Sequence, residues 1–340
     1  MRFPIATKYI PLLGTALVLV LVYVAGAMAY PGFASLYTFK LLLENNSFVG
    51  VAAIGMTFVI LSGGIDLSVG SVVAFTSIFI AKLIFLGFHP LAAIAMSLVL
   101  GAAFGAFQGA LIHFYRQPAF LITLAGMFFA RGMGYVVHDQ ALGIKHEFYS
   151  ESITNWSIPI GPGVQLGLTA IIFIACLLVG LFIAHFTRFG RAVYAIGDDE
   201  QSATLMGIPI GRTKIAVYAL SGFLSALAGV VSTFYQSSGW ANNAIGFELD
   251  AIAATVIGGT LLTGGVGFLA GTGMGVLILG LIQDIINFQG TLSSWWTKIV
   301  VGLLLLLFIG LQTLVTALSR RRIRHVPAVP KPDKPAPAAA

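Results

Sequence analysis

The sequence contains few charged residues and a single cysteine. Only 9% of its 340 residues are Asp, Glu, Lys or Arg, whereas soluble domains carry about 25%. Because 58% of the residues are hydrophobic at the same time, the composition excludes an ordinary soluble domain and indicates a polytopic membrane protein. The lone Cys176 excludes an intrachain disulfide framework and a cysteine-rich metal site.

Sequence motifs for ATP hydrolysis and for common enzyme chemistry are also missing. No Gly-x-x-x-x-Gly-Lys-Ser/Thr motif occurs, so we expect no ATPase activity and no cofactor in this chain. No His-Glu-x-x-His motif or cysteine pair occurs either, which disfavours an integral membrane enzyme. The net charge of +6 does not indicate nucleic-acid binding, because the basic residues lie at the edges of apolar segments.

Ten apolar segments are candidates for transmembrane helices. The first, residues 10–29, follows Arg2 and Lys8 like a secretory signal, but we interpret it as an uncleaved helix because further spans follow. Residues 30–45 are expected to form a loop. We therefore expect an all-α polytopic membrane protein with about ten transmembrane helices. The other nine segments are residues 46–62, 69–87, 91–113, 119–137, 165–186, 214–235, 250–263, 268–287 and 298–318.

The basic residues predict the orientation of these segments. With the N-terminus inside, most of the 18 Lys and Arg residues lie in inner loops or terminal segments, so the positive-inside rule places both termini in the cytoplasm. The tryptophans Trp156, Trp240, Trp295 and Trp296 then fall at the outer face, as interface anchors do. Residues 326–340 are rich in Pro and Ala and are expected to be disordered, which leaves residues 1–325 as one transmembrane domain.

Two apolar stretches are interrupted by paired glycines in the same sequence order. Residues 61–65 read Leu-Ser-Gly-Gly-Ile, and residues 262–266 read Leu-Thr-Gly-Gly-Val. A chance match is the alternative in a chain with 40 glycines. Interrupted helices at corresponding positions of two halves are nevertheless typical of transporters built from repeats. We therefore predict two pseudo-repeated halves, with Gly63, Gly64, Gly264 and Gly265 in the interruptions.

Asp66 is the charged residue of the first interrupted stretch, and a carboxylate at membrane depth is costly unless it has a partner or a function. One interpretation is that Asp66 lines or gates a transport pathway. The other is that it caps the helix that begins near residue 69, by accepting hydrogen bonds from the first amides. In a rival class of protein, an ion-coupled secondary transporter, Asp66 or Asp284 would bind the proton or sodium ion.

The loop of residues 187–213, expected in the cytoplasm, contains its own helix signals. An acidic cluster that begins at Asp198 can cap a helix N-terminus, and Gly207 followed by Pro209 can end that helix. We predict a helix over about residues 199–206 that is either a solvated surface helix or a docking helix for a soluble partner. The residues assigned to this contact are Asp198, Asp199, Glu200, Ala203, Leu205, Met206, Gly207 and Ile208.

Taken together, these stretches resemble the inner-membrane permease family of ABC sugar importers, of the ribose, galactose and galactofuranose type. The similarity is carried by residues 61–71, by the loop from Arg188 to Ile208, and by residues 250–267. It extends over roughly residues 10–318. Residues 124–132 and 290–298 look most like one of the two permeases of a galactofuranose importer. The resemblance implies a multi-pass protein of the bacterial inner membrane.

The resemblance also implies partners. It implies that two permease subunits, identical or different, form the pathway within the lipid bilayer. A periplasmic sugar-binding protein would deliver the sugar, and a cytoplasmic ATP-binding subunit holding Mg-ATP would drive transport. The loop with Gly207 resembles the coupling helix that sits in a groove of that ATPase.

A neutral sugar needs hydroxyl and amide partners in such a pathway, and several side chains offer them. Each of these side chains has an alternative role in a hydrogen bond between helices. The candidates that accompany Asp66 and the paired glycines are Asn45, Asn46, Thr57, Ser62, Ser68, Gln108, Gln283 and Asn287.

Overall fold

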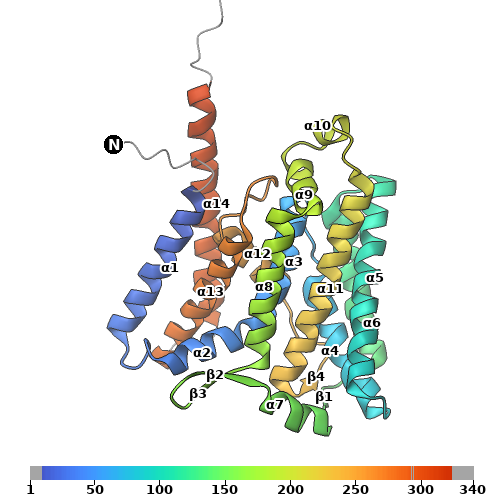
Figure 1. Cartoon of the computed structure of the whole chain (residues 1–340), viewed down its shortest axis with the longest axis vertical. Coiled ribbons are helices and arrows are strands. Elements are labelled where there is room, and N and C mark those ends of the chain that lie inside the picture. The colour runs from blue at the N-terminus through green and yellow to red at the C-terminus, as the bar shows by residue number, and fades with distance from the viewer. Residues whose placement is uncertain (1–9, 292, 294, 324–340) are drawn as a thin grey trace, which may run out of the picture.

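The computed structural model describes residues 10–323 except 292 and 294, and the predicted disorder of residues 326–340 lies outside this range. Figure 1 shows a bundle of helices, most of which run along one direction. The helices are α1 (Ile10–Ala29), α2 (Leu36–Asn45), α3 (Ser47–Leu61), α4 (Val69–Phe85), α5 (Pro90–Tyr115), α6 (Ala119–Val137), a π-helical turn (Phe148–Ser152), α7 (Ile153–Asn155), α8 (Leu168–Phe186), α9 (Arg188–Asp198), α10 (Glu200–Leu205), α11 (Ile210–Gln236), α12 (Phe247–Ile257), α13 (Leu269–Gln289) and α14 (Trp295–Ile323).

Seven of the described helices are long and apolar enough to cross a membrane. They are α1, α5, α6, α8, α11, α13 and α14, and an eighth span results if α2 and α3, which are bent by 53°, count as one. Each of the ten predicted segments contains a helix. The count of ten spans is not confirmed, however, because α4 has only 17 residues and α12 only 11, and a full span needs about 20.

One expectation from the sequence is wrong. Residues 30–45 are not all loop, because α2 begins after Ser35, whose hydroxyl accepts a hydrogen bond from the Thr38 amide at 3.1 Å. The fold is mostly helical, as predicted, and the described residues also include four short strands. The short strands β1 (Leu142–Gly143) and β4 (Ser238–Gly239) pair, as do β2 (Ser157–Gly161) and β3 (Val164–Gly167). All four strands lie at the end of the bundle opposite α10 (Figure 1).

Helix α11 forms the centre of the bundle and packs against α5, α3 and α4. The approach of α5 is close because glycines face each other. A Cβ on Gly101 would lie 2.6 Å from the Gly222 carbonyl oxygen, and a Cβ on Gly105 would overlap the Tyr218 carbonyl. Small residues at such contacts allow helix backbones to approach closely in lipid. The central helix is therefore held by backbone contact rather than by long side chains.

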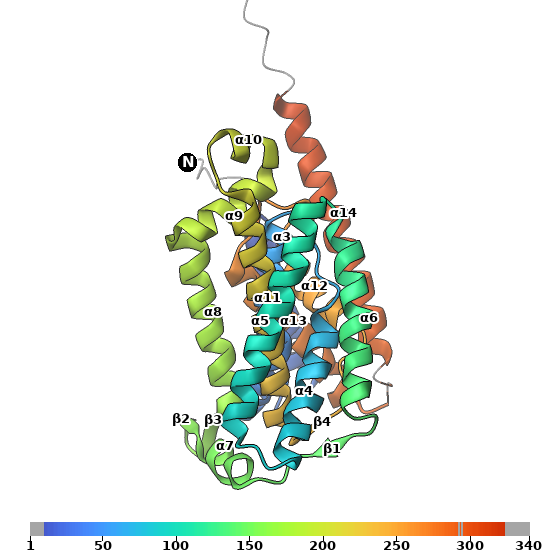
Figure 2. The ribbon, with the colours of Figure 1, turned by 90° about the vertical axis from the view of Figure 1, so that its right-hand side faces the viewer.

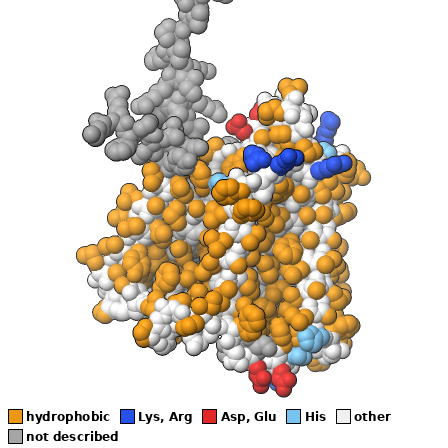
Figure 3. Space-filling model, in the orientation of Figure 1, with side chains coloured by type: hydrophobic (Ala, Val, Ile, Leu, Met, Phe, Trp, Pro, Cys, Tyr) orange, Lys and Arg blue, Asp and Glu red, His pale blue; other side chains and the backbone are white. Residues whose placement is uncertain are grey.

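The surface of the bundle suits a membrane. Figure 3 shows a face covered mostly by apolar side chains, with Lys and Arg gathered at the end that carries α9 and α10. Figure 2 gives the view turned by 90°, in which α10 and the last turns of α14 lie at that same end. Helix α1 also begins there (Figure 1). The four tryptophans belong to segments near the opposite end.

Candidate functional site

The break that follows α3 and the break that precedes α13 pack directly against each other. Gly63, Gly264 and Gly265 have φ angles of +82°, +87° and +73°, which side chains with a Cβ rarely adopt. The Gly265 amide donates to the Leu61 carbonyl at 3.0 Å. A Cβ on Gly264 would lie 2.9 Å from Gly63 Cα. The two breaks that the glycine pairs mark in the sequence therefore meet, backbone to backbone, through Gly63, Gly264 and Gly265.

Helix α9 inserts its C-terminal end into this contact. A Cβ on Gly197 would overlap the Leu61 carbonyl oxygen and lie 2.6 Å from the Gly265 nitrogen. A Cβ on Gly265 would lie 2.7 Å from Asp198 Cα. We call Gly63, Gly197, Gly264 and Gly265 the glycine junction. Because backbones rather than flexible side chains touch here, a displacement of α9 would be transmitted to both breaks.

Helix α9 was not predicted from the sequence, although its signals are present. Thr187 caps the helix, since its hydroxyl accepts a hydrogen bond from the Gly190 amide at 3.1 Å. Gly190, Val193 and Ile196 are buried along one face, at the three- to four-residue spacing of an amphipathic helix. The acidic residues that follow were assigned to the next helix, and the shorter periodic pattern before them was interpreted as loop.

The short helix predicted over residues 199–206 is confirmed as α10. Asp199 is its N-cap and accepts a hydrogen bond from the Ser202 amide at 2.5 Å, which lowers the pKa of the exposed Asp199 carboxyl. Gly207, with φ +76°, ends the helix, and the Ile208 amide donates to the Ala203 carbonyl at 3.1 Å. Asp198 is not the cap, because it is the last residue of α9.

The exposed surface of α10 differs in part from the predicted one. Leu205 and Met206 are 90% and 67% exposed, but Ala203 is fully buried and thus faces its own chain. Glu200 pairs with Lys214 of α11 at 2.7 Å and helps to hold α10 in place. The apolar tip of α10 therefore consists of Leu205 and Met206, without Ala203.

Asp66 is buried in the loop between α3 and α4 and accepts three hydrogen bonds. The Ser68 amide and hydroxyl donate to Oδ1 at 2.9 and 2.6 Å, and the Ser221 hydroxyl of α11 donates to Oδ2 at 2.7 Å. The Asp66 carboxylate thus accepts the amide of Ser68, the N-cap residue of α4, but Asp66 is not itself the N-cap. Asp66 instead ties the loop to the central helix.

Gln108 of α5 extends this network. Its Oε1 lies 3.2 Å from the Ser68 hydroxyl, but that hydroxyl has one proton and already donates to Asp66. The amide is therefore better placed turned over, so that Nε2 donates to the Ser68 hydroxyl oxygen. Ser62 is also buried, and its hydroxyl donates to the Val59 carbonyl at 2.8 Å. Gly64 lies beside the Tyr218 hydroxyl, which a Cβ at that position would overlap.

The other predicted pathway residues lie elsewhere. Thr57 is buried between helices, with its hydroxyl oxygen 2.8 Å from that of Thr272 and 3.3 Å from that of Thr255. Asn46 is buried and donates to the Leu42 carbonyl at 2.9 Å. Asn45 accepts from the Tyr235 hydroxyl at 3.0 Å. The structure does not gather these residues, or the exposed Gln283 and Asn287, with the α3–α4 loop.

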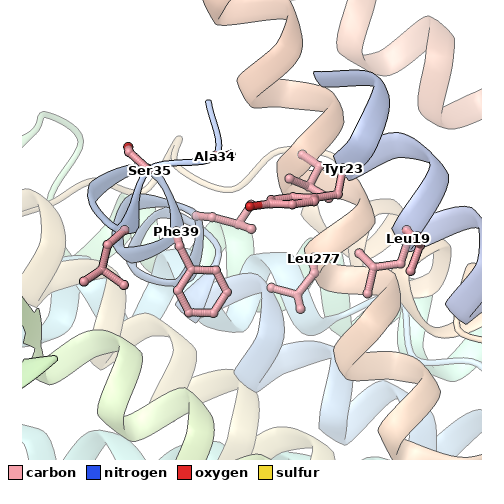
Figure 4. Close-up of a pocket in the computed structure, with 10 residues that line it drawn as sticks. Leu19, Tyr23, Ala34, Ser35, Phe39 and Leu277 are labelled. Atoms are coloured by element: carbon pink, nitrogen blue, oxygen red, sulfur yellow. The ribbon is translucent and has the colours of Figure 1, made fainter. Parts of the chain in front are cut away.

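A pocket of about 520 Å³ lies between α1, α2 and α13. Figure 4 shows Tyr23 of α1 and Phe39 of α2 on opposite sides of it, with Leu277 of α13 below. Its lining is apolar apart from Tyr23 and Ser35 and includes none of the predicted pathway residues. Since a sugar needs several hydrogen-bond partners, this pocket suits an apolar group better than a sugar.

Comparison with known proteins places the chain among transport proteins. Residues 39–309 match the family described as branched-chain amino acid transport system / permease component. The chain belongs to this family. It is 52% identical over 317 residues to the inner membrane ABC transporter permease protein YjfF of Escherichia coli K12, an alignment that covers 93% of this chain and 95% of YjfF.

Two further relatives in the family have names that specify a sugar. The fructose import permease protein FruG of Bifidobacterium longum is 34% identical over 93% of this chain and 94% of its own length. The ribose import permease protein RbsC of Escherichia coli K12 is 36% identical over 85% of this chain and 89% of its own length. The resemblance to sugar importer permeases is thus confirmed, as is the expectation of a multi-pass inner-membrane protein. These relatives are transport components rather than enzymes.

Proposed function

We propose that this chain is the membrane-spanning permease subunit of an ABC importer that carries a monosaccharide across the bacterial inner membrane. The observation that carries the proposal is its similarity, over 85–93% of its length, to permeases whose names specify ABC transport or sugar import. We also propose a galactofuranose-like sugar, on the residues of 124–132 and 290–298.

The proposal includes separate partner proteins. A cytoplasmic subunit would bind Mg-ATP, a second permease would complete the pathway in the membrane, and a periplasmic protein would deliver the sugar. The apolar tip of α10 supports the first of these partners. Leu205 and Met206 are exposed, and α10 lies at the end of the bundle where Lys and Arg gather (Figure 3). Two neighbouring exposed apolar side chains on a capped helix suit a groove in a soluble protein.

The glycine junction suggests how the ATPase moves the permease. ATP binding would shift α10, and α9 would follow because only Asp199 separates the two helices. The end of α9 touches the breaks after α3 and before α13, so both breaks would move with α9. Helix α8 precedes α9 and helix α11 follows α10, so these two helices would move as well. The α3–α4 loop, with Ser62, Gly64, Asp66 and Ser68, would line or gate the pathway.

We further propose ten membrane segments in two pseudo-repeated halves, with both termini in the cytoplasm. The alignment that sets Leu61 on Leu262 also sets Ser47 on Glu248 and Val69 on Ala270. Ser47 and Val69 are the first residues of α3 and α4, and Glu248 and Ala270 are the second residues of α12 and α13. The starts of the two helix pairs therefore correspond to within one residue. On this proposal α4 and α12 cross only part of the bilayer, which is acceptable where broken helices are covered by protein.

Binding of the ATPase subunit tests this function. The chain is co-expressed with its candidate ATP-binding subunit and purified in detergent, as native sequence and as Leu205→Glu or Gly207→Asp. We expect both substitutions to abolish co-purification, because each places a charge in an apolar contact. No atom lies within 4 Å of a Cβ built on Gly207, so the chain itself has room for the new side chain.

Gly163→Asp is the matched control for Gly207→Asp. Gly163 has φ +72°, has open space around it, and lies in the β2–β3 hairpin at the opposite end of the bundle. The two variants therefore carry a similar backbone strain, and Gly163→Asp should retain the ATPase subunit. If the native chain purifies alone and carries sugar down an ion gradient, the rival ion-coupled mechanism with Asp66 or Asp284 replaces the proposal.

A further inference from the structure

The segment between α11 and α12 has an unusual backbone. Ser237, Ala244 and Gly246 have φ angles of +49°, +55° and +73°. Residues with a Cβ rarely adopt this left-handed conformation, and alanine has no side-chain polar group to stabilise it. Backbone strain of this kind persists only where the surroundings hold it, and it is concentrated at functional sites.

Arg131 of α6 holds this segment in place. Its guanidinium donates to the carbonyl oxygens of Ala241 at 2.8 Å, of Asn243, and of Ala244 at 3.3 Å. Within the described residues no carboxylate lies within 4.0 Å of a guanidinium nitrogen of Arg131. An arginine in an apolar bundle is thus used to fix an irregular piece of backbone, although its charge remains close enough to act on Glu248.

Glu248, in the first turn of α12, has an unused hydrogen-bond acceptor. Its Oε2 is buried and has no hydrogen-bond partner among the described residues. It lies against Gly70 in the first turn of α4, where a Cβ would overlap it. The positive end of the α4 dipole makes a negative charge tolerable there, but the acceptor remains unsatisfied. A buried acceptor without a partner calls for a ligand or for another explanation.

The strained segment and the neighbouring part of α6 carry aromatic and amide side chains. The Tyr135 hydroxyl of α6 donates to Asn242 Oδ1 at 3.1 Å. Trp240 and Tyr135 are each 42% exposed, so their rings remain available for contact. Sugars present C–H faces that pack on aromatic rings and hydroxyl groups that donate to carboxylates and amides. Arg131, Tyr135, Trp240, Asn242 and Glu248 together offer each of these contacts.

We propose that these five residues, the α6–α12 polar site, bind the transported monosaccharide, with one sugar hydroxyl donating to Glu248 Oε2. This inference rests on the proposed function and assigns its sugar contacts to residues that the sequence analysis did not select. The site follows β4 and thus lies toward the end of the bundle opposite α10, where a periplasmic protein would deliver the sugar. The strained segment held by Arg131 keeps Trp240 and Asn242 in position.

Transport by the complete complex in proteoliposomes tests the site. The probes are radiolabelled D-galactose, whose aqueous solution includes the galactofuranose form, D-ribose, D-fructose and L-arabinose, each offered with the binding protein and ATP. For the best-carried sugar we expect Glu248→Gln to lower kcat/KM by about 10- to 100-fold, because the sugar hydroxyl loses a charged acceptor. We expect Trp240→Leu to lower kcat/KM by about 2- to 10-fold, because the sugar loses an aromatic face. We also expect the order of preference among the four sugars to change.

Matched controls are Asp139→Asn and Trp156→Leu, two exposed residues outside the site, and both should transport within about twofold of the native chain. Basal ATPase activity and subunit composition should be native in all four variants.

If Glu248→Gln and Trp240→Leu transport with native kcat/KM and native sugar preference, the site is wrong while the importer function stands. If they lose the second permease, the five residues form a subunit contact instead. If the native complex carries none of the four sugars, the proposed monosaccharide transport is wrong, and the proposed site is wrong with it.

Discussion

At the scale of single residues, Asp66 shows how a carboxylate is accommodated within an apolar bundle. Its partners are the Ser68 amide and the hydroxyls of Ser68 and Ser221, so three donors replace water. Hydrogen bonds to a charged acceptor are stronger than those between neutral groups. The carboxylate thus links the α3–α4 loop to α11, the helix around which the bundle is built.

Replacing Asp66 separates this structural tie from a role in transport. Asp66→Ala removes three hydrogen bonds and leaves two buried serine hydroxyls without their acceptor, so we expect a loss of about 2–4 kcal/mol in the free energy of unfolding. Asp66→Asn keeps Oδ1 for Ser68 and offers an amide to Ser221, and should cost about 1 kcal/mol. The measurement is the Tm of the detergent-purified chain, with sugar uptake assayed in parallel.

Asp139→Ala is the control for Asp66→Ala, because Asp139 is exposed and its replacement should leave the Tm unchanged. Normal uptake by Asp66→Asn would show that the negative charge does not gate the pathway. Native stability of Asp66→Ala, in contrast, would contradict the proposed tie. A stable Asp66→Asn variant without uptake would assign the charge a role in transport.

The residues around Asp66 also show what a sequence can predict about a site. The composition identified Asp66 because a charge among apolar residues is conspicuous. It did not identify Ser221 as the partner, since serine is common on membrane helices and the two residues are far apart in the chain. Arg131 and Glu248 were missed for a similar reason, because their importance depends on the strained segment 237–246, which is visible only in three dimensions.

At the scale of elements, capping residues decided which short helices were predictable. Helix α10 was predicted because Asp199 and Gly207 mark both of its ends. Helix α2 was not predicted although Ser35 caps it, because residues 30–45 were interpreted as one loop after the first apolar segment. The backbone contact of Gly63 with Gly264 also lay beyond the sequence, since the repeat predicts two similar breaks but not that they touch.

The contact between the two breaks predicts an asymmetry between two glycine substitutions. Gly264→Ala should be strongly destabilising, because its φ of +87° is strained for alanine and its Cβ would lie 2.9 Å from Gly63 Cα. Gly290→Ala shares the strain, with φ +69°, but has no atom within 4 Å of its Cβ. We expect Gly290→Ala to lower the free energy of unfolding by about 1–2 kcal/mol, from the left-handed backbone alone. We expect Gly264→Ala to lower it by several kcal/mol.

Thermal unfolding of both variants in the same detergent measures this difference. Gly264→Ala should have the lower Tm by a clear margin and should also weaken sugar uptake, because the junction joins α9 to both breaks. Equal Tm values for the two variants would mean that the backbones at Gly63 and Gly264 do not touch, and the proposed route from α10 to the breaks would lose its basis.

At the scale of the whole molecule, helix length sets the topology. Each of the ten apolar segments predicted from the sequence contains a helix, but apolar patterning did not show which of these helices are long enough to span a membrane. The difference lies in α4 and α12, which begin after the irregular segments 62–68 and 237–246. Such segments are tolerated at membrane depth only where protein or water surrounds them, and these surroundings are formed by helices from elsewhere in the chain.

The length of α5 makes the sidedness of the molecule testable. With 26 residues, α5 extends about 39 Å and separates the loop at Phe88 from the loop at Gln117. Single cysteines at Phe88, Gln117, Trp156 and Leu205, all exposed positions, are introduced into a Cys176→Ala background. We expect a membrane-impermeant maleimide to label Phe88→Cys and Trp156→Cys from the periplasm, and Gln117→Cys and Leu205→Cys only in inside-out vesicles.

Each pair of labelling sites decides a separate point. Labelling of Phe88→Cys and Gln117→Cys from the same side would mean that α5 does not cross the bilayer, which would contradict the assignment of the longest apolar helices as spans. Labelling of Leu205→Cys from the periplasm would place α10 where no ATP-binding subunit can reach it. In the expected pattern, α10 shares the cytoplasmic end with the start of α1 and the end of α14 (Figure 1), and the α6–α12 polar site lies toward the periplasm. That arrangement is required if sugar binding and ATP-driven movement act at opposite ends of one bundle.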